Sequence, residues 1–418
     1  MKNLEFEVPG PGSWTLEVLH YNRPVSRYAG QHFFDALMEG MRQSNEHYGT
    51  PLEKLEFQLI NRFIYLQPRP VGAPPGATDL PPKWLFTLMQ YLHPAIRKRR
   101  KRARWAVAEK IWRNDVALWD NEVKPAVLAR AAELRAVDVA ALSGDELITH
   151  LQETSDFVLE TVINHHRFNN TFAVPLGIFL SQTMDWTGLP ASDCLRLFEG
   201  YSEVSRGSIA ELGNLREALQ SDSEMSALIG SDTPSDSILE TLRERSGPVG
   251  DAVTSYINGA GYCMLTGYDV ADLMAIESPD MMMRLIRTAL EGGTEEGQLA
   301  GNNVTATVRA AVPDEHKSEF DELLTEARLT YRMRDERGAN GDAMSVALSR
   351  RAVLEAGRRL IEQNKLKDPK EAAEATLDEI TGLLRGGSFP SADEIHARAA
   401  YRLNHTVDDA PPFLGTKP

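Results

Sequence analysis

Residues 105–123 read WAVAEKIWRNDVALWDNEV, and this stretch decides the class of fold. Trp105, Trp112 and Trp119 recur every seven residues. Seven residues make nearly two turns of an α-helix, so the three rings share one face, together with Val116 and Val123. The spacing predicts a long amphipathic helix whose tryptophan seam faces a core.

The same helical spacing of apolar residues recurs over most of the chain after residue 83. It covers residues 142–164, 190–221, 235–260, 279–290, 313–334 and 343–364. Ser143 and Ser235 stand where helix caps are expected. Residues 303–311 fit a short strand and a helix equally well. This pattern predicts a mainly α protein, with a helical body over residues 84–418.

The N-terminal part differs in composition. Trp14–Leu19 and Leu55–Tyr65 are rich in aromatic and branched residues, which is typical of short strands, and residues 29–48 between them have helical spacing. Six prolines between Pro68 and Pro82 then exclude both a helix and a central strand. We therefore expect a small β-containing part over residues 1–83 that ends in this Pro/Gly-rich loop.

Composition indicates a globular protein of the cytoplasm. Of the 418 residues, 42% are hydrophobic and 25% are charged, which is ordinary for folded domains. The N-terminus has no apolar signal segment, and no later stretch is long and apolar enough to insert into a membrane. Cys194 and Cys263 are too few for a disulfide framework, and their apolar neighbours predict buried thiols.

The charge is distributed unevenly. The formal net charge is −15, but residues 97–104 read RKRRKRAR and carry +7, which leaves −22 (the difference between −15 and +7) on the rest of the chain. This run fits an exposed helical stripe, an RNA or membrane patch, or a docking surface for an acidic partner. The acidic remainder favours the docking surface, with neither nucleic acid nor membrane as partner.

Motifs for nucleotide and metal chemistry are missing from the sequence. It contains no G-x-x-x-x-G-K-[ST], no strand-borne G-x-G-x-x-G, no H-E-x-x-H and no C-x-x-C. We therefore expect no cofactor and no metal in this chain.

His165 and His166 form the first candidate catalytic group. They lie in a largely apolar stretch, and neighbouring helical residues point about 100° apart, so the pair cannot chelate one metal as a unit. Two interpretations stay open, a hydrogen-bonded core histidine and a general base for a bound hydroxyl.

A cluster of charges at 334–337 forms the second candidate. Arg334 and Arg337 are three residues apart on one helical face, and Asp335 and Glu336 can hold their guanidinium groups. On charge pattern alone a solvated salt-bridge face is the more common outcome, and the functional interpretation is an arginine clamp for a transferring phosphoryl group.

Aromatic and methionine residues farther along the helices fit either the core or an apolar substrate pocket. They are Phe172, Phe179, Trp186, Tyr262, Met264 and Tyr268.

Several stretches together resemble a known family. They are Trp14-x-x-Glu17-x-x-His20-x-x-Arg23-Pro24-Val25-Ser26, Asn61-x-Phe63-x-Tyr65, Arg334-Asp335-Glu336-Arg337, LSRRAVLEAGRRL at 348–360, KDPKE at 367–371, TLDEI at 376–380 and PPFLG at 411–415. They resemble the central region of phosphoenolpyruvate-synthase-like phosphotransferases, the group to which rifampin phosphotransferase and phenylphosphate synthase belong.

The resemblance implies a division of labour. In that family an ATP-grasp domain phosphorylates a histidine on a small swivelling domain, which carries the phosphoryl group to an acceptor bound by a helical central domain. This chain is similar to the central domain alone. The resemblance thus implies an acceptor-binding subunit that presents an alcohol or phenol, with ATP and Mg on an ATP-grasp partner subunit and phosphate on a phosphohistidine partner subunit.

The resemblance also assigns roles to residues. Arg334 matches the arginine that opens the family's R-[DE]-x-R-like segment, so it is the first expected contact of the transferring group and Arg337 the second. Gly338 and Gly341 stand where bulkier residues are common, and residues 258–262 lack a usual histidine or arginine, which implies a reshaped pocket. The alternative is a non-catalytic helical binding or regulatory subunit.

Overall fold

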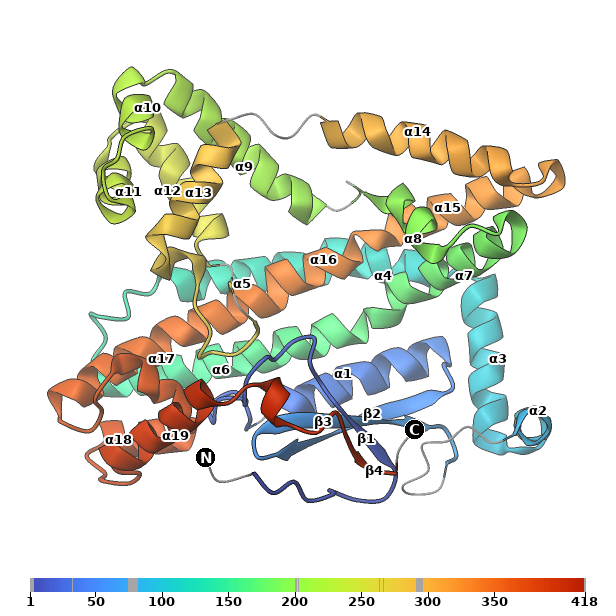
Figure 1. Ribbon diagram of the computed structural model, residues 1–418, viewed down its shortest axis with the longest axis horizontal. Coiled ribbons are helices and arrows are strands. Elements are labelled where there is room, and N and C mark those ends of the chain that lie inside the picture. Colours follow the sequence, from blue (N-terminus) through green and yellow to red (C-terminus); the bar gives the residue numbers. More distant parts are fainter. Residues whose placement is uncertain are drawn as a thin grey trace. The chain divides into compact units, whose positions relative to one another are not determined.

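The computed structural model describes residues 4–31, 33–73, 82–199, 201, 203–262, 264–265, 267–290 and 296–416. The protein is mainly α-helical, with one small antiparallel sheet that is built largely from N-terminal residues (Figure 1). The predicted fold class is therefore confirmed.

The chain forms two compact units that alternate along the sequence. Unit 1 comprises residues 1–170, 266–272 and 344–418, and unit 2 comprises residues 171–265 and 273–343. Composition led us to expect a division of the chain after residue 83. The two compact units are not separated at that position, and the expected division stays a prediction. Most of the Pro/Gly-rich loop that marks it, residues 74–81, lies outside the described residues.

Unit 1 contains the sheet. Its strands are β1 (Ser13–Leu16), β2 (Leu52–Ile60), β3 (Phe63–Pro70) and β4 (Phe413–Gly415), in the order β2-β3-β1-β4. All pairs are antiparallel, and Trp14 of β1 lies opposite Leu414 of β4. Trp14, Phe63 and Tyr65 are buried in one apolar cluster with Leu414, so the two ends of the chain share a core.

The single strand expected over Leu55–Tyr65 is a hairpin, so that prediction was wrong. Asn61 and Arg62 both have positive φ, 50° and 67°, and they join β2 to β3 as a tight two-residue turn. Pro68 was also wrongly excluded from strand structure. It lies at the end of β3 beyond Leu66, the last residue that pairs with β1, so a missing N–H is tolerated there.

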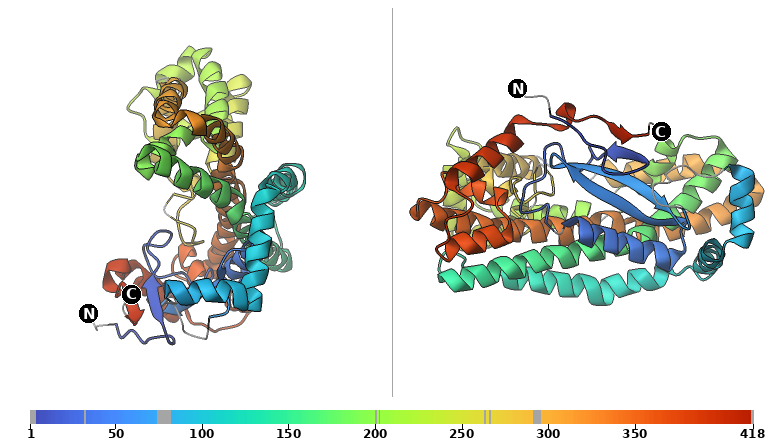
Figure 2. Two further views of the ribbon diagram at one scale, coloured as in Figure 1. Left: turned by 90° about the vertical axis from the view of Figure 1, so that its right-hand side faces the viewer. Right: turned by 90° about the horizontal axis from the view of Figure 1, so that it is seen from below.

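Helices cover the sheet in successive layers. Helix α1 (Phe33–Tyr48) packs against β2 and against α6 (Gly144–Arg167), which packs in turn against α17 (Met344–Glu362). Figure 2 shows α1 beside the sheet. The predicted cap of α6 is confirmed, because the Ser143 and Glu146 side chains form a capping box. The remaining elements that pack near α17 are α5 (Lys124–Ala136), η6 (Pro369–Glu374), α18 (Leu377–Leu384) and α19 (Ala392–Asn404).

The expected tryptophan helix is broken. Residue Lys110 has a φ of 48°, which ends one helix and starts another in a new direction. Trp112 and Trp119 are buried as predicted, but Trp105 is 45% exposed and does not belong to the core. The elements of this stretch are α2 (Lys83–Leu92), α3 (Pro94–Ala108), α4 (Trp112–Leu118) and the π-helix η1 (Trp119–Val123).

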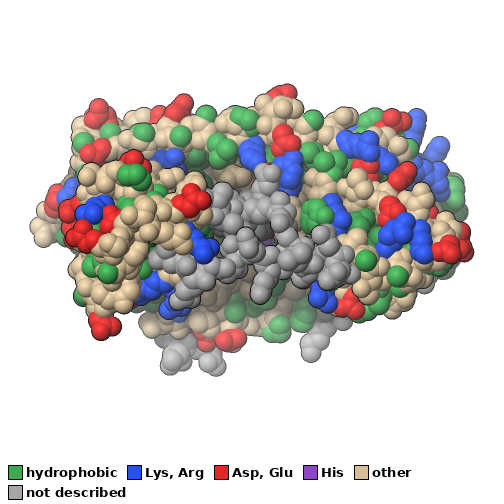
Figure 3. Space-filling model, turned by 90° about the horizontal axis from the view of Figure 1, so that it is seen from above, with side chains coloured by type: hydrophobic (Ala, Val, Ile, Leu, Met, Phe, Trp, Pro, Cys, Tyr) green, Lys and Arg blue, Asp and Glu red, His purple; other side chains and the backbone are tan. Residues whose placement is uncertain are grey.

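Unit 2 consists of helices. They are most of α7 (Asn169–Thr187), α8 (Ala191–Leu195), α9 (Glu203–Gln220), α10 (Ser223–Ile229), α11 (Ser235–Glu244), α12 (Pro248–Ala260), α13 (Pro279–Leu290), α14 (Glu296–Ala311), α15 (Lys317–Tyr331) and α16 (Met333–Arg337). On the face seen in Figure 3, acidic and basic side chains lie close together.

Several expectations for unit 2 are settled. The segment 235–260 is two helices, because Gly247 has a φ of 82°. Ser235 is not a cap, since Pro234 holds that position without a side-chain hydrogen bond. Residues 303–311 are helical, as part of α14. Cys194 is buried as expected, and Cys263 lies outside the described residues.

None of the helices in the described part of the chain is long and apolar enough to cross a membrane.

The close approach of α1 to α6 depends on Gly40. A Cβ atom at this position would lie 2.5 Å from the carbonyl oxygen of Ile163 and 2.8 Å from the Cβ of His166. We expect Gly40→Ala to lower the free energy of unfolding by about 1–3 kcal/mol, because the two helices must separate. Gly144→Ala is the matched control, since no atom lies within 4 Å of its added Cβ. Urea denaturation measures both, and equal effects would show that the helix contact is loose.

Candidate functional site

Unit 1 contains a small pocket between the Tyr28–Phe33 segment, α6, α17 and the short segment 267–272. Its free space is about 40 Å³, room for roughly three water-sized groups. Apolar and aromatic side chains form most of the wall. The lining residues are Tyr28, Ala29, Gln31, Phe33, Ser155, Val158, Leu159, Tyr268, Val270, Val346, Ser349 and Leu377.

One group of polar atoms in the wall is already hydrogen-bonded. The hydroxyl of Ser349 donates to Tyr28 Oη at 3.3 Å. Burial raises the pKa of Tyr28 to about 12, although hydrogen bonds to Ser349 and Ser155 act against this rise. Tyr28 is therefore protonated at neutral pH and cannot serve as a base.

Gln31 is the polar residue of the wall that lacks a partner. Its amide nitrogen is buried and makes no hydrogen bond with any described residue. A buried amide N–H without an acceptor costs about 1–3 kcal/mol. Gln31 lines this pocket and also a second hollow beside α1 and β2. A bound oxygen atom on the pocket side would satisfy this donor, which suits the pocket to a small molecule with an apolar body and one hydroxyl oxygen.

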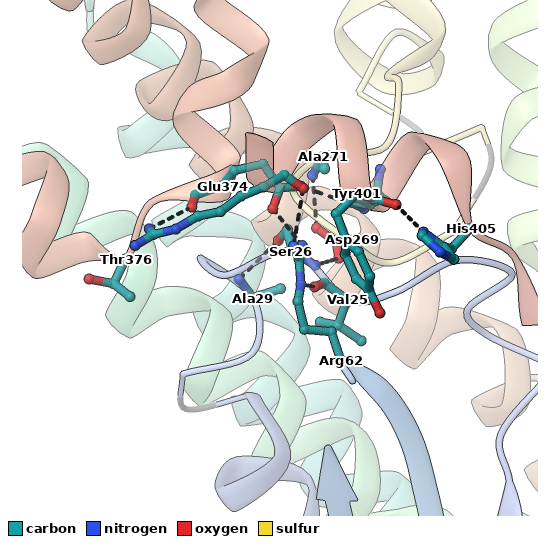
Figure 4. Close-up of polar contacts among 12 residues, drawn as sticks. Val25, Ser26, Ala29, Arg62, Asp269, Ala271, Glu374, Thr376, Tyr401 and His405 are labelled. Carbon is teal, nitrogen blue, oxygen red and sulfur yellow. Dashed lines mark hydrogen bonds and ion pairs between the residues drawn. The ribbon is translucent and has the colours of Figure 1, made fainter. Parts of the chain in front are cut away.

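The Asp269 carboxylate fixes two walls of the pocket relative to each other (Figure 4). It is fully buried, and it accepts hydrogen bonds from the backbone N–H of Ser26 at 2.7 Å and of Ala271 at 2.9 Å. The hydroxyl of Ser26 accepts from the N–H of Ala29, which lines the pocket. One carboxylate thus joins the 26–29 turn to the segment that carries Val270.

Two arginines attach the segment 267–272 to helices of unit 1. Arg350 of α17 donates to the carbonyl oxygen of Val270 at 2.8 Å, and Arg402 of α19 donates to Asp272 at 3.2 Å. Both arginine residues are buried. The segment is therefore held by charge-assisted bonds from two directions.

Arg62 connects the hairpin turn to the same network, as Figure 4 shows. Its guanidinium donates to the carbonyl of Val25 at 2.7 Å and to the Glu374 carboxylate, and it lies 5.7 Å from the centre of the Tyr401 ring. A non-glycine residue at positive φ is strained. The contacts of the Arg62 side chain explain why arginine stands at a position where glycine is common.

The network contains more acids than bases. The carboxylates of Asp269, Asp272 and Glu374 face the guanidinium groups of Arg62 and Arg402. Burial raises the pKa of Glu374 to about 7, with a further contribution from Asp269, while Arg62 and Arg402 oppose the rise. Burial and Asp269 also raise the pKa of Asp272. The network can therefore take up a proton near neutral pH.

Three of the predicted site residues lie in unit 1. Tyr268 lines the pocket, and its role as a substrate-binding residue stays a prediction. His165 and His166 lie together near the end of α6, with ring centres 4.7 Å apart. Both are half-buried, and the Nδ1 atom of His166 lies 3.2 Å from the Asn169 amide nitrogen. Neither histidine is among the residues that line the pocket.

The predicted arginine pair lies in unit 2, in two different environments. The Arg334 side chain is 58% exposed and donates to the Tyr331 hydroxyl at 2.8 Å. Arg337 is buried, bonds to the carbonyl of Met333 and lies 4.9 Å from the centre of the Phe172 ring. Burial lowers the pKa of Arg337 to about 10, so it remains charged at neutral pH.

The acidic partners are also divided. Asp335 lies 3.9 Å from Arg334, but Glu336 is fully buried and binds Arg332 at 2.9 Å. The expectation that Glu336 holds the guanidinium group of Arg334 or Arg337 stays a prediction.

The predicted aromatic and methionine residues of unit 2 lie in several environments. Phe179 and Trp186 belong to an apolar core of unit 2, where Trp186 stacks on His316. Tyr262 follows α12, and Met264 pairs with Met274 in an isolated bridge. Their role as substrate contacts stays a prediction.

Most residues of the pocket, and the buried polar residues that hold its walls together, were not predicted from the sequence. Gln31, Tyr28 and Asp269 carry no recognisable local motif. Ser26, Ser349 and Leu377 do lie within the stretches that resemble the phosphotransferase family, and unit 1 brings these distant stretches together. That resemblance was the one signal that could have found the site.

Comparison with known proteins adds no relative. No family model matches the chain, and no curated protein matches its sequence. Within the described residues, no group of three or more His, Cys, Asp or Glu side chains is placed to hold a metal ion.

The raised pKa of Glu374 predicts a pH-dependent stability. The folded state binds this proton more tightly than the unfolded state, whose value is 4.5. The resulting stabilisation is complete below pH 4.5 and is lost as the pH rises to about 7. Between these values we expect the stability of the wild type to fall relative to Glu374→Gln by on the order of 1 kcal/mol per pH unit.

Urea denaturation across this pH range tests the prediction. Asp378→Asn is the control, because this carboxylate is exposed and lies four residues from Glu374. A Glu374→Gln protein whose stability changes with pH as steeply as the wild type would show that Glu374 does not titrate in this range.

Proposed function

We propose that this chain is the acceptor-binding subunit of a phosphoenolpyruvate-synthase-like phosphotransferase. It binds a small alcohol or phenol and presents the hydroxyl group to a phosphohistidine on a partner subunit, and a phosphate ester is formed. ATP and Mg bind to a further partner, an ATP-grasp subunit. The observation that carries the proposal is the apolar pocket of unit 1 with its buried, unsatisfied Gln31 amide.

The chemistry of the wall supports binding of a neutral hydroxyl compound. Aromatic and branched side chains surround the space, and the lining residues that belong to the described part of the chain include no Asp, Glu, His, Lys or Arg. A charged ligand would therefore lose its hydration without gaining a counter-ion. A hydroxyl oxygen can accept from Gln31, while the ring or alkyl body replaces water against Val158 and Val346.

The size of the pocket limits the ligand. Its 40 Å³ is well below the volume of clefts that hold drug-sized molecules, roughly 300–1,000 Å³. Short alcohols fit the space directly, and a one-ring phenol requires Phe33 or Tyr268 to move. Both of these side chains are partly exposed, so the movement does not disrupt the core.

The stretches that resemble the family at 14–26, 61–65, 348–360, 367–371, 376–380 and 411–415 belong to unit 1, and the stretch at 334–337 belongs to unit 2. Arg334 remains the proposed contact of the transferring phosphoryl group, and the exposure of its side chain is compatible with an approaching partner. His165 and His166 remain proposed alternatives.

Binding of phenol, with toluene as the ligand that lacks the hydroxyl, tests the pocket. We expect the wild type to prefer phenol, and Gln31→Met to lose about three- to tenfold in phenol affinity because one hydrogen bond is lost. Toluene affinity and thermal stability should not fall, since the substitution removes an unsatisfied donor. Gln58→Met, at an exposed position of β2, is the control.

Saturation-transfer NMR and calorimetry measure these affinities. Equal binding of phenol by the wild type and Gln31→Met would place the acceptor elsewhere. The competing function is a non-catalytic binding or regulatory subunit. Adding ATP, Mg and the two partner subunits distinguishes the two functions. Phosphate ester formation, followed by ³¹P NMR, occurs only if the chain takes part in phosphoryl transfer.

A further inference from the structure

A second surface of unit 1, formed by α2 and α3, exposes apolar and basic side chains together. On α2, Trp84 is 70% exposed, Tyr91 57% and Leu92 66%, and Leu88 is also exposed. Trp84, Leu88 and Tyr91 are spaced by four and three residues, so they lie on one helical face. Exposed apolar faces of this kind mark interaction sites.

The adjacent helix α3 carries the basic run, but its cations are not equivalent. Arg99 lies 3.7 Å from Glu46, and Arg102 donates to the His47 carbonyl at 2.6 Å, so these two side chains attach α3 to α1. The exposed cations Arg97, Lys98, Lys101 and Arg104 have no carboxylate within 4 Å among the described residues. The unpaired positive charge therefore faces outward.

A groove of about 940 Å³ borders α3 on the side of α1 and β2, and the described side chains of α2 do not line it. Its wall contains both signs of charge. Residues that line it include Glu46, Glu53, Lys98, Lys101, Arg102 and Trp105.

We propose that the α2–α3 surface docks a separate protein subunit whose contact face is acidic around an apolar centre. The apolar strip of α2 receives the centre, and Lys98 and Lys101 pair with the surrounding carboxylates. The chain outside the basic run carries a formal charge of −22 (−15 less +7). This basic surface is therefore opposite in sign to the rest of the chain. Association through this surface then proceeds faster at low salt.

The groove favours a protein over other polyanions. Glu46 and Glu53 lie among the cations of the groove wall, so its charge pattern is mixed. A protein contact face can match both signs of charge, whereas a phosphate backbone or an anionic lipid surface presents only one. A bilayer is flat and cannot fill a concave groove. The aromatic rings are also partly covered, because Arg100 lies 4.5 Å from the Tyr91 ring and Arg102 lies 4.1 Å from the Trp105 ring, which disfavours base stacking.

The first step of the test identifies the partner by contact. A photo-crosslinking amino acid is incorporated at Leu88 in the cells that make the protein. The control position is Arg385, an exposed residue directly after α18. Figure 1 shows α18 and α2 at opposite ends of unit 1. We expect one protein to crosslink at Leu88 and not at Arg385. Absence of a specific protein crosslink at Leu88 overturns the proposal.

The second step measures binding of that purified protein by calorimetry at about 50 and about 500 mM salt. We expect Trp84→Ser with Leu88→Ser to weaken binding at least tenfold at both salt concentrations. Lys98→Glu with Lys101→Glu should weaken it at least tenfold at low salt and much less at high salt. Because these side chains are exposed, the melting temperatures of the variants should match the wild type.

Matched controls complete the test. Lys370→Glu with Arg385→Glu makes the same charge change at exposed positions of unit 1, and binding should remain within twofold of the wild type. Equal losses in this control, or tight binding of phosphatidylserine vesicles or single-stranded RNA that depends on Lys98 and Lys101, overturns the proposal. A partner that neither carries phosphohistidine nor binds ATP would confirm the docking surface and contradict the proposed transfer function, so the two are tested separately.

Discussion

The buried Asp269 carboxylate is the interaction on which the candidate site depends. It bonds to Ser26 and Ala271, residues that are 245 positions apart in sequence (271 less 26), and each neighbours a segment that lines the pocket. A buried carboxylate is stable only when its oxygens are hydrogen-bonded and cations lie near. Arg402 supplies the nearby charge, and Arg62 enters the same network through Glu374. Removing one member would leave another charge buried, so the groups form one cooperative unit.

Local strain and local excess of charge occur at the same place. Arg62 adopts a left-handed backbone conformation, and Glu374 has a pKa raised to about 7. Neither the strained backbone nor the buried carboxyl group favours folding by itself. Both are maintained by the packing of the surrounding helices and sheet. Gln31 adds an unsatisfied donor to the adjacent pocket. Departures from local rules that gather in this way are typical of functional sites, which is why we propose the pocket as the acceptor site.

The fold class followed from the sequence because helical periodicity is strong and local. The capping box at Ser143 and the exact bounds of α13 are read from neighbouring residues alone. The errors have identifiable causes. Asn61-Arg62 lacks the glycine that signals a two-residue turn, and the strain is offset by contacts of Arg62 with residues more than 300 positions away. Lys110 likewise breaks the tryptophan helix without a glycine or proline. The pocket itself is made of unremarkable residues whose proximity is set by tertiary structure.

The central claim is that Asp269 joins the two walls of the pocket. Hydrogen exchange of Asp269→Asn, followed by mass spectrometry, tests it most directly, since asparagine keeps the shape of the side chain and lacks one acceptor oxygen. The account predicts faster exchange in peptides that contain Ser26 and Ala271, by tenfold or more, with unchanged exchange in the β2–β3 hairpin. Unchanged exchange at both Ser26 and Ala271 would contradict it.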